Sequence, residues 1–327
     1  MNSTEIDDIL TKSIRSAVET EEYVRPSGGR YTYTVTDRDR GATVRQIMKR
    51  RLGFSSRLTA KFKRGLGKVT RNGVPVRNFA EVIPGDVLEI TMPEEISHFQ
   101  PQDIPVSAIF EDDDLIVINK QPGITVHPTK THADDTLANG IMKRMLDRGE
   151  KYKIRFVNRL DMDTSGVLVV VKNAFCQDAM VRMMKRDEVK KYYCAIVDGI
   201  IEEDEGTIDA PIGRKPDDTV RRAVVEGGSP SVTHYRVLER FKSGYTYIAL
   251  RLETGRTHQI RVHMAYKGHP VTGDPLYGPG DCGLIGRQAL HARRIVFQHP
   301  VSGELIDAEA PLPRDMADLL EKLRTEA

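Results

Sequence analysis

The chain has 327 residues, a length typical of about two domains, and it contains 39% apolar and 29% charged residues, an ordinary balance for a soluble protein. The formal net charge is only +2, so net charge identifies no partner. The sequence contains no run of about 18 apolar residues, so a helical membrane span is excluded. The polar N-terminus lacks the apolar segment of a secretory signal, and we therefore expect a cytoplasmic protein.

Composition divides the chain into four segments. Residues 1–30 are polar and end in Pro-Ser-Gly-Gly, which predicts a flexible extension. Residues 31–92 hold thirteen lysines and arginines against five acidic residues, an excess of eight positive charges, and the rest of the chain carries an excess of six negative charges. Residues 93–105, with three prolines, are typical of a linker that leads to residues 106–327. By charge alone, the basic segment is either a polyanion-binding domain or a solvated basic face.

Three elements are predicted in the basic segment. Apolar residues at positions 44, 47, 48 and 52 recur at helical spacing. Asn72-Gly73 stands between two short apolar stretches and is a strong signal for a β-hairpin. The turn at residues 84–86 leads into VLEIT (87–91), which is typical of a strand.

Beyond residue 106 strands predominate. The predicted strands are LIVIN (115–119), VLVVVK (167–172), YYCAIV (192–197), THYRVLERF (233–241) and YTYIALRLET (245–254). Helices are expected at 136–146, 174–186, 256–266 and from about Pro313 to the C-terminus. Strands in mostly antiparallel runs with a few helices predict an α+β domain, with the small α/β basic unit beside it.

The segment NRLDMDTSG (158–166) immediately precedes the predicted buried strand at 167–172. A carboxylate at the end of such a strand, beside an arginine, is a candidate nucleophile or base. Asp161 and Asp163 could equally cap a turn, as Asp side chains often do. Taken alone, the segment favours the turn.

Two further segments carry candidate side chains. Tyr193, in KYYCA (191–195), could stack on a flat ring or belong to the core. In TGRTHQIRVH (254–263), Arg256 and Arg261 are permanent cations suited to a carboxylate or a phosphate. His258 and His263 are five residues apart and do not share a helical face, so they predict no metal site.

Several motifs are missing. The three cysteines form no CxxC pair, and the nine histidines show no HExxH spacing, so neither a disulfide framework nor a zinc site is predicted. No GxxxxGK[ST] sequence is present, which argues against a P-loop. We expect a protein without a metal or a nucleotide cofactor.

Taken in order, RLDMDTSG (159–166), KYYCA (191–195), LETGRTHQIRVH (252–263), GHP and GDPLYG (268–278) and LHA (290–292) resemble the RNA pseudouridine synthases of the family that modifies large-subunit ribosomal RNA and some tRNAs. The resemblance covers about residues 106–300. It implies the fold of that family and isomerisation of uridine to pseudouridine in RNA. This reaction changes no oxidation state, which agrees with the missing cofactor motifs.

The same resemblance assigns roles within the catalytic machinery. It implies that Asp161 is the catalytic carboxylate, that Arg261 pairs with it, and that Tyr193 stacks on the target base. Burial raises the pKa of a carboxyl group, so a permanent cation is needed to keep Asp161 ionised in a site that excludes water. The family usually has His before Arg-Leu-Asp, whereas this chain has Asn158.

Four more residues are implied in substrate binding. Leu290 closes the pocket, although by itself a leucine before a strand indicates packing. Arg159 fills the space that the flipped base leaves, and extrusion of that base costs roughly a few kcal/mol. Arg256 and His258 complete the predicted substrate contacts.

Residues 31–92 resemble the αL RNA-binding motif first seen in a small-subunit ribosomal protein, with SSR (55–57) and NGVPVRNFAEVIPGDVLEI (72–90) as the cue. The resemblance implies RNA binding through phosphate contacts, for which the candidates are Arg57, Lys61, Lys63 and Arg64. The expected partner is ribosomal RNA bound by a monomer.

Three alternatives remain open at this point. The target could be a tRNA uridine. The chain could be a non-catalytic RNA-binding or ribosome assembly protein. A glycosidase-like hydrolase using Asp161 and Asp163 is disfavoured, because residues two apart in an extended segment give no defined opposed geometry.

Overall fold

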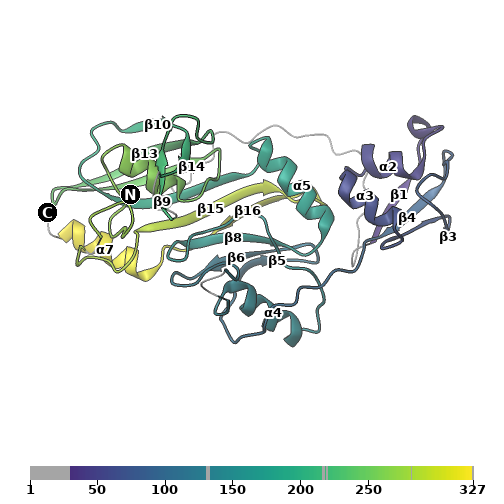
Figure 1. Cartoon of the computed structure of the whole chain (residues 1–327), viewed down its shortest axis with the longest axis horizontal. Coiled ribbons are helices and arrows are strands. Elements are labelled where there is room, and N and C mark those ends of the chain that lie inside the picture. Colours follow the sequence, from purple (N-terminus) through teal and green to yellow (C-terminus); the bar gives the residue numbers. More distant parts are fainter. Residues whose placement is uncertain (1–29, 130–132, 216–217, 219, 281, 326–327) are drawn as a thin grey trace.

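The computed structural model describes residues 30–325 except 130–132, 216, 217, 219 and 281, and it contains a small N-terminal sheet and a large C-terminal sheet (Figure 1). Apart from Arg30, the extension predicted at residues 1–30 lies outside the described residues. None of the helices within these ranges combines the length and the apolar character needed to cross a membrane.

The N-terminal sheet is antiparallel, with the order β1-β4-β2-β3. Its strands are β1 (Arg30–Thr34), β2 (Lys68–Arg71), β3 (Val74–Pro75) and β4 (Val87–Thr91), accompanied by the 3₁₀ helix η1 (Asp37–Asp39) and by α2 (Val44–Arg50) and α3 (Ser56–Lys63). The residues at 44, 47, 48 and 52 are buried together, which confirms the predicted helical stripe. Asn72 and Gly73 both have positive φ, 52° and 78°, as a two-residue type I′ hairpin requires.

The large sheet follows the order β10-β13-β14-β9-β15-β8-β6-β5, with β16 paired to β15 and β7 paired to β8. Its strands are β5 (Ser107–Glu111), β6 (Leu115–Lys120), β7 (Arg155–Phe156), β8 (Ser165–Val171), β9 (Lys190–Asp198), β10 (Glu205–Asp209), β13 (Val232–Phe241), β14 (Tyr245–Leu252), β15 (Leu290–Gln298) and β16 (Leu305–Glu309). A separate two-stranded sheet contains β11 (Ile212–Arg214) and β12 (Arg222–Val224).

Side chains of β6 and β8 alternate between two hydrophobic clusters on the two faces of the sheet, as expected from the period of two in a strand. Positions 116, 118, 168 and 170 pack in one cluster with α4 (Leu137–Asp147), α6 (Gln259–Tyr266) and α7 (Arg314–Thr325). Positions 115, 117, 167 and 169 pack in the other cluster with α5 (Ala174–Lys185). The predicted α+β fold with a mostly antiparallel sheet is confirmed.

The exception to antiparallel pairing among the named strands is β8 with β15. Gly166 of β8 lies directly opposite Ala292 of β15. A Cβ atom on Gly166 would lie 2.1 Å from the Ala292 carbonyl oxygen, and its φ of 109° is itself unfavourable for other residues. The glycine of the TSG turn therefore allows the backbones of the two central strands to approach closely.

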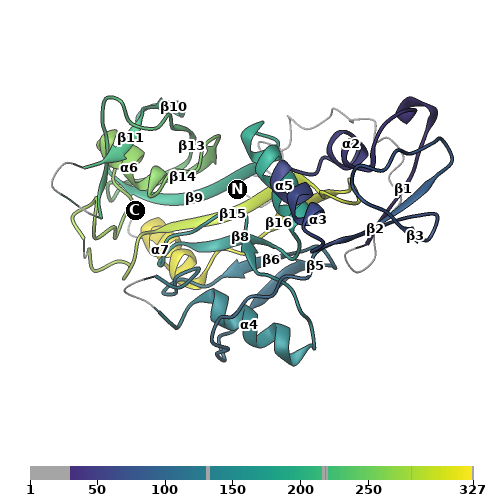
Figure 2. The same cartoon turned by 45° about the vertical axis from the view of Figure 1, so that its right-hand side comes forward.

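The N-terminal sheet is packed against α5 rather than held away from it (Figure 2). The Phe175 ring lies 4.9 Å from the Tyr31 ring and 5.5 Å from the Phe54 ring, between centroids. Glu95, in the segment predicted as a linker, lies 2.7 Å from Lys61 Nζ and 2.6 Å from Arg155 Nη2. Residues 93–105 thus form no helix or strand but make ordered contacts on both sides.

Two sequence predictions need correction. The helix expected at 256–266 begins at Gln259, because His258 adopts a left-handed backbone with φ 59° and the Gln259 side chain accepts from the Arg256 N–H. Strands β5, β7, β10, β11, β12 and β16 were not predicted; most of them are short and at least partly exposed. Such segments carry a weak hydrophobic pattern, because their pairing is set by neighbouring strands.

His291 gives the fold a pH dependence. Its side chain is fully buried, with Nδ1 2.9 Å from Ser165 Oγ and Nε2 3.2 Å from the Ala310 carbonyl oxygen. Burial lowers the pKa of His291 to about 4 from 6.5. The unfolded chain therefore binds a proton between pH 6.5 and 4 that the folded chain excludes, so stability is lost as pH falls through this window.

We expect His291→Gln to weaken this pH dependence. Between pH 7 and 4.5 the free energy of unfolding should fall by roughly 2–3 kcal/mol less in the variant than in the wild type. Urea denaturation at both pH values measures the difference. Parallel pH profiles for the two proteins would contradict the assignment.

Candidate active site

Asp161 lies in the loop between β7 and β8, where its carbonyl oxygen accepts a bond of 3.1 Å from the Thr164 N–H. The loop leads into the buried strand β8, which begins at Ser165. The carboxylate therefore lies at the N-terminal end of a central strand, as the sequence predicted. The Asp161 side chain is 18% exposed, so the carboxylate is largely removed from bulk water while still reachable.

Arg261, on α6, joins Asp161 to a second carboxylate. Its Nη1 donates to Asp161 Oδ2 at 3.0 Å, and its Nε and Nη2 donate to the two carboxylate oxygens of Asp274 at 2.6 and 2.8 Å. The arginine side chain is 4% exposed and that of Asp274 is fully buried. Burial opposes the guanidinium charge, but Asp274 and then Asp161 outweigh it and raise the pKa of Arg261. The predicted Asp161–Arg261 pair is present.

His258 faces the other carboxylate oxygen. Its Nε2 lies 3.7 Å from Asp161 Oδ1, and its Nδ1 lies 2.8 Å from the hydroxyl of Tyr277, which also accepts from the Arg222 N–H at 2.8 Å. Burial lowers the pKa of His258 although the nearby Asp161 favours the charged form. The histidine is therefore neutral at neutral pH, and Arg261 provides the permanent charge beside Asp161.

Two buried cations hold the backbone of the Asp161 loop. Lys120, at the end of β6, donates from Nζ to the carbonyl oxygens of Gln121, Met162 and Thr164 at 2.8, 2.7 and 3.0 Å. Three acceptors satisfy all three ammonium hydrogens. Burial lowers the pKa of Lys120 to about 7.

Arg287 provides the second anchor. Its Nη1 donates to the Asp163 carbonyl oxygen at 2.9 Å and to that of Leu290 at 3.3 Å, and its Nε and Nη2 form a fork on Asp315 of α7 at 2.6 and 2.9 Å. The C-terminal helix is thereby connected to the Asp161 loop and to the start of β15.

Asn158 is a structural residue of this loop. Its Oδ1 accepts from the Val169 N–H at 2.9 Å, and its Nδ2 donates to the Val167 carbonyl oxygen at 3.3 Å. Both the oxygen and the nitrogen of the Asn158 amide therefore form hydrogen bonds with the backbone of β8. At the position where the family resemblance led us to expect histidine, Asn158 thus supports the backbone of β8.

Tyr193 and Leu290 come from the adjacent strands β9 and β15, where Leu290 pairs with Ala195. They are 8% and 4% exposed and line a narrow cavity of about 50 Å³ together with Asp161 and Arg261. Burial, followed by the Asp161 charge, raises the pKa of Tyr193, so its hydroxyl stays protonated. The predicted stacking and pocket-closing residues thus meet at the predicted carboxylate.

Wider cavities of about 260 and 380 Å³ lie beside the narrow one. All three border on Arg159, Asp161 and His258. Arg159 is exposed, whereas Arg256 lines two of the cavities and donates from Nε to the Pro230 carbonyl oxygen at 3.2 Å. All seven predicted catalytic and substrate-binding residues therefore surround one groove.

The four basic residues predicted to contact phosphates behave differently. Arg57, Lys63 and Arg64 are exposed on and just after α3. Lys61 is the exception, because its ammonium lies 2.7 Å from Glu95 Oε2 and its side chain is only 17% exposed. We therefore interpret Lys61 as a link between the small sheet and residues 93–105.

Sequence reasoning missed Asp274, Lys120 and Arg287. Asp274 was recognised only within the GDPLYG motif and was given no role there. In the structure Asp274 bonds to Arg261, and its Oδ1 also accepts from the backbone N–H groups of Leu276 and Tyr277. Lys120 is the last residue of an apolar strand, and its side chain is fully buried. An unpaired lysine rarely occupies such a position. That placement was a usable signal for Lys120.

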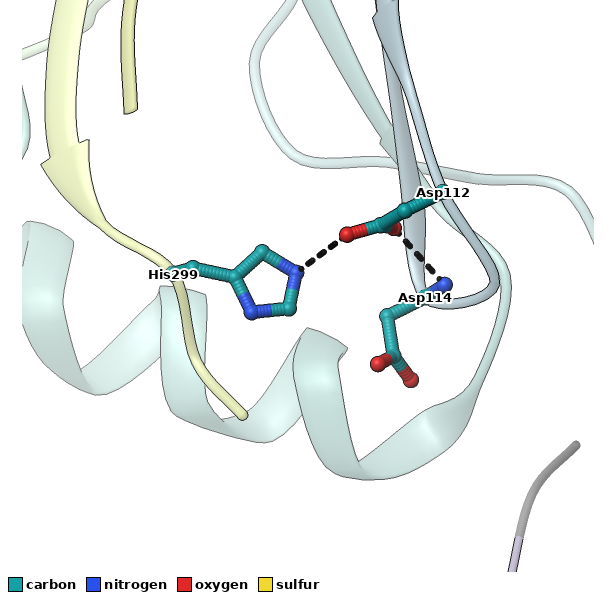
Figure 3. A group of neighbouring side chains, drawn as sticks. All are labelled: Asp112, Asp114 and His299. Carbon is teal, nitrogen blue, oxygen red and sulfur yellow. Dashed lines mark hydrogen bonds and ion pairs between the residues drawn. The ribbon is translucent and has the colours of Figure 1, made fainter. Parts of the chain in front are cut away.

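Asp112, Asp114 and His299 form a cluster that could be taken for a metal site (Figure 3). His299 Nδ1 accepts from the backbone N–H groups of Val301 and Ser302, so its proton resides on Nε2, 3.0 Å from Asp112 Oδ2. A metal ligand needs a free lone pair on that nitrogen. Asp114 instead accepts from Asn173 Nδ2 at 2.6 Å. The cluster lies at the opposite end of β6 from Lys120, about 20 Å along the strand, and we interpret it as a support for the β5–β6 turn.

We expect Asp274→Asn to destabilise the protein strongly. The variant leaves a buried guanidinium with one carboxylate instead of two, and loss of one partner from a buried pair costs about 3–5 kcal/mol. Urea denaturation measures the free energy of unfolding. The control is Asp204→Asn, which breaks an ion pair with Arg240 in which the aspartate is 86% exposed and should change stability by less than about 1 kcal/mol. Equal effects of the two substitutions would contradict the buried bridge.

A model of the RNA pseudouridylate synthase family matches residues 114–266, which include Asp161, Tyr193 and Arg261. The uncharacterized RNA pseudouridine synthase YlyB of Bacillus subtilis (strain 168) is 44% identical over 262 residues, 79% of this chain and 86% of YlyB. Ribosomal large subunit pseudouridine synthase D of Haemophilus ducreyi is 40% identical over 286 residues, 83% of this chain and 87% of its own length.

A solved structure gives the same result for the fold. Human RNA Pseudouridylate Synthase Domain Containing 1 matches with a TM-score of 0.53 at 28% identity, over 68% of this chain and 96% of the human chain. The matched sequences extend over most of their own length, so the similarity is not limited to one motif. The chain belongs to the RNA pseudouridine synthase family.

Proposed function

We propose that this enzyme uses Asp161 to convert uridine to pseudouridine in large-subunit ribosomal RNA. The observation that carries the proposal is the position of Asp161, which is largely buried in a groove and accepts a hydrogen bond of 3.0 Å from the permanent cation Arg261. The proposed RNA rests on similarity to a relative named as a ribosomal large subunit pseudouridine synthase.

The chemistry requires little beyond these residues. The bond between C1′ of the ribose and N1 of uracil breaks, the base turns, and a C1′–C5 bond forms while the C5 proton is lost and N1 gains a proton. Asp161 supplies the electron pair, either by attack on the sugar or by removal of a sugar proton. The net change is an isomerisation, so no oxidant or energy source is consumed.

The surrounding side chains would hold the flipped uridine. Tyr193 offers its neutral ring to the base, Leu290 limits the slot, and Arg159 is exposed at the groove where it can replace the base in the RNA stack. Arg256 and His258 border the same groove.

For the remaining parts of the chain we propose a division of labour. Residues 31–92 act as the RNA-binding domain, and residues 106–327 act as the catalytic domain. Residues 93–105 join the two domains, and the extension at residues 1–30 precedes the first. The exposed cations Arg57, Lys63 and Arg64 support phosphate binding by the first. We further propose that the enzyme acts as a monomer in the cytoplasm.

We expect Asp161→Asn to abolish turnover, because a neutral amide cannot supply the electron pair. Tritium release from RNA labelled at C5 of uridine should fall by more than roughly a thousandfold, while the dissociation constant for the same RNA changes little. Asp204→Asn, at an exposed aspartate, is the matched control and should keep full activity.

The product analysis decides between the remaining functions. Release of free uracil would favour the hydrolase with Asp161 and Asp163, and RNA binding without tritium release from the wild type would favour a non-catalytic assembly protein. Comparing labelled tRNA with labelled large-subunit RNA identifies the substrate. Turnover by folded Asp161→Asn at the wild-type rate would refute the catalytic role.

Replacing Arg57, Lys63 and Arg64 together by glutamine should weaken RNA binding and its salt dependence. Each lost phosphate contact lowers the slope of log K against log salt by about 0.9, so the triple variant should lose up to about 2.7. Filter binding over a salt series measures the slope. An unchanged slope would mean that these cations do not contact RNA.

A further inference from the structure

Lys191 is a buried cation that the proposed reaction does not use. It stands on β9 two residues before Tyr193, so the two side chains share a face of the sheet. Lys191 is only 6% exposed, and within the described residues its Nζ makes neither a hydrogen bond nor an ion pair. Asp187 is the acidic group whose charge acts on Lys191. Its Oδ2 accepts from Lys190 Nζ at 2.6 Å and from Arg251 Nη1 at 3.3 Å.

Lys191 borders the largest of the three cavities, of about 380 Å³. Phe156, Met184 and Leu252 provide apolar parts of its wall, and Tyr193 separates it from the narrow slot at Asp161. The basic side chains on the cavity include the two permanent cations Arg159 and Arg256 together with Lys191, whose pKa is lowered by burial. The one acidic group on the cavity, Asp161, is already bonded to Arg261. The cavity therefore combines an apolar surface with an uncompensated positive charge.

The side chain of Lys191 is largely buried but lines the cavity without a protein partner for its ammonium in the described part of the chain, so an anion that enters the cavity can bind there. We propose that this cavity holds a nucleotide next to the target uridine in the RNA chain, with a phosphate oxygen bonded to Lys191 Nζ and the base against Phe156 and Met184. The volume lies within the usual 300–1,000 Å³ range of ligand sites. This inference rests on the proposed function, because it takes RNA as the ligand.

The position of the cavity agrees with an RNA path over the protein. Met184, near the end of α5, borders the cavity. Phe175, near the start of α5, contacts Tyr31 of the N-terminal sheet and Phe54 of the segment between α2 and α3. Figures 1 and 2 show α5 between that sheet and the large sheet. An RNA strand that leaves the basic segment can follow α5 to the cavity and reach Asp161.

The test compares Lys191→Met with Lys191→Arg in the full chain. The probe is large-subunit ribosomal RNA transcribed without modifications, and the dissociation constant is measured over a salt series that needs no turnover. Loss of one phosphate contact should weaken binding by about tenfold and lower the slope of log K against log salt by about 0.7–0.9. Arginine should restore both, and KM should rise in Lys191→Met while kcat changes by less than about twofold.

Lys143→Met is the matched control, because Lys143 lies on α4 with its ammonium 2.6 Å from Asp147. It removes the same charge and should leave the slope unchanged. The inference would be overturned if folded Lys191→Met kept the wild-type slope and affinity. It would also be overturned if the variant had a lower melting temperature and a lower kcat but an unchanged slope, because that result indicates a purely structural role. Neither result bears on the catalytic role of Asp161, whereas failure of the wild type to release tritium overturns the proposed function instead.

Discussion

The candidate active site depends on one buried guanidinium. Arg261 bonds to Asp161, 100 residues earlier in the chain, and to Asp274, 13 residues later. A lone buried arginine would be unstable, and a lone buried carboxylate would take up a proton. Two nitrogens of Arg261 bond to Asp274, and the third bonds to Asp161, which remains accessible to a substrate. The bridge therefore fixes the position of Asp161 and places a permanent positive charge beside it.

The large sheet serves this bridge by holding the loop that carries Asp161. Gly166 lets β8 approach β15, and the carbonyl groups of residues 162–164 then bond to Lys120 and Arg287. These two cations originate from β6 and from the segment before β15, and Arg287 is itself held by α7. The loop is anchored from both sides, which limits its motion and keeps the carboxylate in register with Tyr193 and Leu290.

The N-terminal segment contacts α5 and β7 through aromatic rings and one shared carboxylate. Phe175 packs on Tyr31 and Phe54, and Glu95 bonds to Lys61 and Arg155. These contacts set the separation between the exposed cations of α3 and the groove at Asp161.

The sequence by itself determined the local elements and the chemical inventory. Helical spacing located α2, Asn72-Gly73 located a hairpin, and the apolar run after Gly166 located β8, because each of these signals arises from interactions between near neighbours. The motifs also identified Asp161, Arg261, Tyr193 and Leu290 through a family resemblance. Only the tertiary structure decided that Asp274 supports Arg261, that Lys61 is bound to Glu95, that Lys120 and Arg287 anchor the loop, and that Lys191 lines a cavity. Those partners come together through the order of strands in the sheet, and spacing along the chain carries no information about which distant carboxylate or carbonyl a buried cation will reach.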